Sequence, residues 1–218
     1  MKLAVINGSP RGEKSNSKKI GAWITSQQGL HNDLTVDTYY LFKINRQDAY
    51  IEDLSGTYIL LFIFPLYVDS MPGIVKLFFE KLEQKKQAFG GRPVYFVIHS
   101  GFPELIHSRS LERYLKYYAT KIMDMNHLGT IIWAGSEPLQ MAPDNFFRKK
   151  IILFEGQLAT ILTKKRLPED ISEQLGGKEH ISKFQSIIYP ITPFKDFYWN
   201  SQLKKNKAKK LLKNQPYA

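Results

Sequence analysis

The amino-acid sequence predicts an α/β fold, a three-layer sandwich whose five-stranded parallel sheet has the strand order 2-1-3-4-5. Three observations support this prediction. Five short apolar runs alternate with stretches of helical periodicity, most runs end in loops rich in Gly, Pro and Ser, and several contain few polar residues. Strands separated by helices indicate right-handed crossovers between parallel strands. We expect the strands at residues 3–6, 34–41, 58–64, 93–99 and 128–134.

The first half of the chain supplies three of these strands. Residues 3–6 are aliphatic and stop at a polar loop, as expected for a buried strand. Apolar and polar side chains alternate well enough in residues 34–41 to predict a second strand. Residues 58–64 are continuously apolar, which favours a strand buried on both faces. Residues 48–54 predict a short helical turn. A helix at residues 18–28 would place three apolar side chains on one face: Ile20, Trp23 and Ile24.

The second half continues the alternation. Residues 72–87 predict a helix, with a proline at a permitted first-turn position. Residues 93–99 form another apolar run that ends abruptly, and a helix is expected at 104–125. A fifth strand at 128–134 and a fifth helix at 145–165 complete the sandwich.

The length of 218 residues and hydrophobic content of 43% predict one domain with an appendage. We assign residues 1–167 to the sandwich and residues 168–218 to an extension, because the alternation of strands and helices stops near Pro168. The extension contains an aromatic, proline-broken segment, residues 190–199, before a lysine-rich tail. Two interpretations stay open: its aromatic side chains pack on the domain or on a second subunit, or they form a flap over the active site.

Charge and composition exclude several classes of protein. The net charge is +11, but residues 200–218 hold six lysines and no acid, so the body carries only +5 and nucleic-acid binding is not favoured. The absence of cysteine excludes disulfides, thiolate metal sites and a cysteine nucleophile. The five histidines show no metal-binding spacing, so no metal is expected. No signal-peptide pattern or membrane span is recognisable, and we expect a soluble, cytoplasmic protein.

The loop after the first strand has the composition of a phosphate site. A strand, a hydroxyl-rich loop and a helix N-terminus bring free N–H groups and the positive end of the helix dipole to one point. The Walker and dinucleotide-binding glycine patterns are both absent, which favours a single terminal phosphate. One polar residue is expected to serve only as the helix cap. The candidate ligands are Ser9, Arg11, Ser15, Asn16 and Ser17.

Two further loops open on the same edge of the predicted sheet. In the loop at residues 65–72, Tyr67 is suited to lie against a flat ring, although the same residues also fit a proline-rich turn with one packed tyrosine. In the loop at residues 100–104, Gly101 allows the backbone to approach a ligand closely.

These motifs together resemble those of the NAD(P)H-dependent FMN reductases of the flavodoxin-like fold. Gly8-Ser9-Pro10-Arg11 with Ser15-Asn16-Ser17 resembles their phosphate loop, and Pro65-Leu66-Tyr67 with Ser70-Met71-Pro72 and Lys76 resembles their second signature. The resemblance covers residues 1–134. It implies that residues 1–167 form an FMN-binding domain, with the five polar residues above on the FMN phosphate. The flavin ring and ribityl chain would contact Pro65, Leu66, Tyr67, Val68, Ser100, Gly101 and Phe102.

The activity that the resemblance implies is hydride transfer from NADPH or NADH, through bound FMN, to a small acceptor such as a quinone, nitro compound, azo compound or flavin. The cofactor carries this chemistry, so no catalytic residue is assigned. The basic surface favours NADPH, and the family often builds its site at a homodimer interface. Two alternatives stay open: a flavodoxin-type electron carrier, and a non-catalytic flavin-fold protein with a polyanion-binding tail.

Overall fold

A computed structural model describes residues 1–27, 29, 33–56, 59–140, 142–181, 200, 203, 204 and 207. The chain divides into two units, Met1–Glu179 and His180–Ala218. The aromatic segment at residues 190–199 lies outside the described residues, as does most of the lysine-rich tail. Both interpretations of that segment therefore stay predictions. The sheet and the helices that cover it belong to the first unit.

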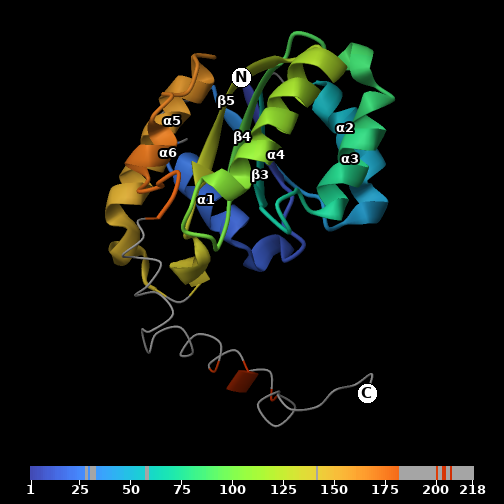
Figure 1. Ribbon diagram of the computed structural model, residues 1–218. Helices are drawn as coiled ribbons and strands as arrows, with labels where there is room; N and C mark the ends of the chain where they lie inside the picture. Colours follow the sequence, from blue (N-terminus) through green and yellow to red (C-terminus); the bar gives the residue numbers. More distant parts are fainter. Residues whose placement is uncertain are drawn as a thin grey trace, which may run out of the picture. The chain divides into compact units, whose positions relative to one another are not determined.

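The predicted sheet is confirmed. Its five strands are all parallel and have the order β2-β1-β3-β4-β5 (Figure 1). Every residue of β3 and β4 is buried, because these central strands are covered by helices on both faces. The strands are β1 (Lys2–Asn7), β2 (Thr35–Tyr40), β3 (Ile59–Pro65), β4 (Pro93–His99) and β5 (Asn126–Trp133).

Helices cover the sheet on two sides and bury two separate hydrophobic cores (Figure 1). One core joins one face of the sheet to α2 (Gln47–Ser55), α3 (Gly73–Glu83) and α4 (Ile106–Tyr117). The other core joins the opposite face to α1 (Asn16–Ile24), α5 (Arg148–Leu162) and the short α6 (Ile171–Gln174). No helix in the described part of the chain is both long and apolar enough to cross a membrane.

The helices differ from the predicted ranges mainly at their ends. The predicted turn at 48–54 is a regular helix, α2, because Tyr50, Ile51 and Leu54 bury one face of it in the core. The long helix expected at 104–125 is shorter and ends in a π-helical turn, Tyr118–Ile122. Its start lies two residues later because residues 104–105 pair with the chain near Lys178 instead.

The free edge of β5 is covered by the chain after α5 rather than by another strand. The Leu167 N–H donates to the Leu128 carbonyl at 2.8 Å, and the Ser172 hydroxyl accepts the Ile132 N–H at 2.9 Å. Ile171 and Leu175 are buried in the second core. The compact unit therefore continues to Glu179, and the boundary that we placed after residue 167 lies inside it.

A glycine in β5 makes this edge contact possible. Gly129 has φ +145°, and a Cβ there would lie 2.8 Å from the Cβ of Leu167. We predict that Gly129→Ala lowers the free energy of unfolding by about 2 kcal/mol, through backbone strain and overpacking. Gly156→Ala is the control, since that helical glycine faces open space and alanine should stabilise it by about 0.5–1 kcal/mol. Urea denaturation measures the free energy of unfolding of both variants. Equal changes in Gly129→Ala and Gly156→Ala would contradict the role given to Gly129.

Candidate functional site

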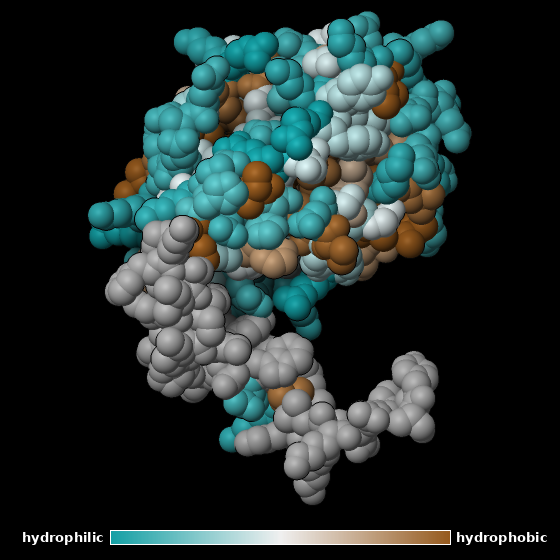
Figure 2. Space-filling model, in the orientation of Figure 1, coloured by the Kyte–Doolittle hydropathy of each residue, from teal (hydrophilic) through white to brown (hydrophobic). Residues whose placement is uncertain are grey.

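The loops that follow the strands meet at the carboxyl edge of the sheet, at the bottom of Figure 1. In parallel α/β sheets this edge is where ligands bind. Figure 2 shows hydrophobic side chains exposed along this lower edge, below a largely polar surface. The exposed large hydrophobic residues of these loops are Phe42, Ile44, Tyr67, Val68, Phe102 and Phe146.

Asn7, the last residue of β1, organises the loop that leads into α1. Its Oδ1 accepts the Ser9 N–H at 2.9 Å, and its Nδ2 donates to the Ser15 hydroxyl at 3.1 Å. Ser15 is the N-cap of α1, because its hydroxyl accepts the Lys18 N–H at 3.1 Å while donating to the Gly12 carbonyl. The Ser15 side chain thus shapes the loop and has little capacity left for a ligand.

The donors that remain in this loop are mainly backbone groups. The first N–H groups of a helix have no intrahelical acceptor. In α1 that of Lys18 is capped, so those of Asn16 and Ser17 remain for an anion within the described part of the chain. The exposed Arg11 guanidinium forms no ion pair with the described residues, and the buried Ser9 hydroxyl accepts the Arg11 N–H at 3.3 Å. This arrangement can bind a phosphate.

His99, at the end of β4, is buried between two of the loops. Its Nε2 lies 2.8 Å from the Ser17 hydroxyl and its Nδ1 lies 3.2 Å from the Ser136 hydroxyl. Burial lowers the pKa of His99 from 6.5 to about 3, so the ring is neutral at physiological pH. In the neutral ring one nitrogen donates a hydrogen bond and the other accepts one, so both nitrogens have a partner among the two hydroxyls. Asn16 strengthens the link, since its Nδ2 donates to the Ser136 carbonyl at 3.0 Å.

The loop after β3 is a tight turn with unusual backbone angles. Pro65 and Leu66 are buried, and the Leu66 N–H donates to the His99 carbonyl at 2.8 Å. Tyr67 and Ser70 then pair through two backbone hydrogen bonds. The residues between them, Val68 and Asp69, have φ of 49° and 56°. This left-handed conformation is strained for Val68, which is β-branched. The turn leaves Tyr67 43% exposed and Val68 95% exposed at the edge.

The loop after β4 faces the same edge. Ser100 is buried, and its hydroxyl donates to the Phe102 carbonyl at 3.2 Å. Phe102 is half exposed and stacks on His107 with 4.4 Å between ring centroids. A Cβ at Gly101 would lie 3.1 Å from the Glu137 carboxylate, so a side chain at this position would have to displace the exposed side chain of Glu137.

The structure therefore places the predicted site residues on three neighbouring loops, but their roles differ from those expected of their side chains. The hydroxyls of Ser15 and Ser17 bond inside the protein, and Asn16 ties α1 to the loop after β5. Sequence reasoning missed Asn7 and His99, and it gave the histidines no role in the site. The available signal was position, since both residues are polar and end an apolar strand. Among the described residues no group of side chains has the arrangement of a metal site.

The profile of the flavodoxin-like fold family matches residues 1–148, which is most of the unit just described. The chain belongs to this family. Among curated proteins, no sequence matches the chain.

Solved structures of flavodoxin-like proteins resemble the chain over most of their length. The Trp repressor binding protein from Bacillus subtilis is 23% identical, with a TM-score of 0.56 over 76% of this chain and 99% of its own. An FMN-dependent NADH-azoreductase from Bacillus anthracis, solved with FMN, is 12% identical, with a TM-score of 0.58 over 73% and 98%. An NADPH-quinone reductase from P. pentosaceus is 17% identical, with a TM-score of 0.54 over 73% and 98%. At these identities the likeness establishes the flavodoxin-like fold.

The buried imidazole at the site predicts a pH dependence of stability. Between pH 6.5 and about 3 the unfolded chain binds a proton at His99 that the folded protein does not. The stability provided by the neutral ring is therefore complete above pH 6.5 and is lost as the pH falls. We predict a contribution of about 1.4 kcal/mol per pH unit below 6.5. Urea denaturation between pH 7 and pH 5 should show that the free energy of unfolding falls less steeply with pH in His99→Gln than in the unmodified protein. Identical pH dependence in the two proteins would contradict this assignment.

Proposed function

We propose that the protein is an FMN-dependent NAD(P)H oxidoreductase that passes a hydride to a small acceptor such as a quinone, nitro compound, azo compound or flavin. The observation that carries the proposal is the anion cradle at α1 beside two exposed loops on the same edge of the sheet. FMN would supply the redox chemistry, and the protein would supply binding, orientation and exclusion of water.

The phosphate end of FMN fits the loop after β1. The N–H groups of Asn16 and Ser17 lie at the positive end of the α1 dipole, and Arg11 adds a charge that no described acid neutralises. Gly8 brings the loop close to the core, since a Cβ there would lie 2.4 Å from Val75 Cγ2. In this proposal the hydroxyls of Ser9 and Ser15 hold the loop while the backbone and Arg11 hold the phosphate.

The flat ring of FMN fits the other two loops. The exposed Tyr67 and Phe102 offer aromatic surface, and the tight turn at Val68 presents backbone groups to the polar edge of a ring. Pro65, Leu66, Ser100 and Gly101 would complete the lining of the flavin site, and of these four only Gly101 is exposed. The exposed side chains of the turn support the further proposal that a second copy of the chain covers the site in a homodimer.

An anaerobic absorption experiment tests the activity. After FMN is added and excess is removed by gel filtration, we expect a retained flavin spectrum that bleaches on addition of NADPH. Because the body of the protein is basic, NADPH should reduce the flavin faster than NADH does. Retained flavin that NADPH and NADH both leave oxidised would contradict the activity and favour an electron carrier.

A charge substitution tests the phosphate cradle separately from turnover. We predict that Arg11→Gln weakens FMN binding about tenfold or more, as expected for the loss of a charge-assisted hydrogen bond. Riboflavin lacks the phosphate, so its affinity should not change. Lys2→Gln is the matched control, because this exposed lysine lies at the other end of β1. Equal weakening of FMN and riboflavin, measured by fluorescence titration, would place the phosphate elsewhere.

A further inference from the structure

A second cleft lies at the opposite end of β5, away from the flavin loops. It has a volume of about 340 Å³ and is lined by α4, by the start of β5 and by the chain after α5. His127, in its floor, pairs with Val94 at the start of β4, whereas the site residue His99 pairs with Trp133. His127 and Trp133 are six positions apart along β5, which corresponds to about 20 Å. The two sites are therefore separate.

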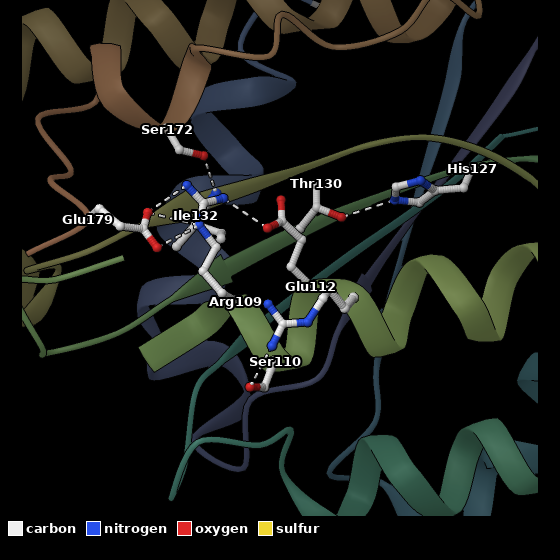
Figure 3. A network of polar contacts seen from close by, with 9 residues as sticks. Arg109, Ser110, Glu112, His127, Thr130, Ile132, Ser172 and Glu179 are labelled. Atoms are coloured by element: carbon white, nitrogen blue, oxygen red, sulfur yellow. Dashed lines mark hydrogen bonds and ion pairs between the residues drawn. The ribbon is translucent and has the colours of Figure 1, made fainter. Parts of the chain in front are cut away.

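Backbone contacts build this cleft. Figure 3 shows the starting part of β5 with His127 and Thr130, and α4 beneath it with Arg109 and Glu112. The outer wall is held by the hydrogen bond between Leu167 and Leu128. Gly129 lets that wall come close, as its missing side chain leaves room for Leu167.

The charges around the cleft are mostly positive and, within the described part of the chain, mostly without an acidic partner. Lys116 and Arg166 form no ion pair with any described residue, and the Arg113 guanidinium donates to the Ser110 hydroxyl at 3.2 Å. Of the two lining acids, Glu112 pairs with Arg109 at 2.8 Å, an arginine that also pairs with Glu179 at 3.0 Å, and Glu169 is exposed.

His127 adds a polar group inside the cleft. The residue is only 8% exposed; its Nε2 lies 3.0 Å from the Thr130 hydroxyl, and its Nδ1 has no hydrogen-bond partner in the described part of the chain. Burial, followed by the charges of Lys116 and Arg166, lowers the pKa of His127 to about 4. Both cations are therefore close enough to act on the ring, and an anion between them would be favourable.

We propose that this cleft binds the phosphate group of a small phosphorylated molecule. Arg166 and Lys116 would hold the phosphate oxygens, and the free nitrogen of His127 would share a hydrogen bond with the ligand. The volume exceeds that of a single phosphate and leaves room for a short organic group. This proposal is independent of the flavin chemistry, because it uses none of the same residues.

The test follows the ring signals of His127 by NMR, assigned with His127→Gln, during titration with inorganic phosphate or glycerol 3-phosphate. We expect saturable shifts and a rise in the pKa of His127 with both ligands, and none with glycerol at the same ionic strength. Tighter binding of glycerol 3-phosphate would identify a phosphate ester as the ligand, and equal binding would identify free phosphate.

Substitutions test whether the ligand that shifts the His127 signals binds in this cleft. Lys116→Gln and Arg166→Gln should each raise the dissociation constant at least tenfold, whereas Lys149→Gln, an exposed lysine on α5, should not change it. Arg11→Gln should also leave the His127 response unchanged, which separates this site from the flavin phosphate cradle. Absence of saturation, or an equal response in all four variants, would overturn the proposal.

Discussion

A neutral imidazole at the carboxyl end of β4 holds the candidate site together. His99 is shared between the hydroxyls of Ser17 and Ser136, so it fixes the start of α1 against the loop after β5. Moving either serine would leave a buried ring nitrogen without a partner, at a cost of about 1–3 kcal/mol. The free N–H groups of Asn16 and Ser17 belong to the same turn of α1. The geometry of the cradle therefore depends on this buried contact.

The fold could be predicted well because its central strands follow a simple rule. Residues of β3 and β4 are buried on both faces, so their sequences are continuous apolar runs. The cover over the β5 edge could not be predicted, since it depends on tertiary contacts of Leu167 and Ser172 that leave no periodic pattern. For the same reason α2 was predicted only as a short helical turn, because its few apolar residues become informative only against the core.

The site was predictable at the level of loops and less so at the level of atoms. Hydroxyl-rich composition marks the loop after β1, but composition does not say whether a serine faces a ligand or the protein. Ser15 and Ser17 face the protein. His99 was missed because a single histidine at a strand end has no spacing pattern, and only the burial and partners of its ring reveal its role.

The central claim is that FMN binds across these loops with its phosphate at the start of α1. A crystal structure of the protein with FMN tests it most directly. The account predicts the phosphate against the N–H groups of Asn16 and Ser17, within reach of Arg11, and the flavin ring between Tyr67 and the loop containing Gly101. A flavin bound anywhere else, or a phosphate that contacts none of these groups, would contradict it.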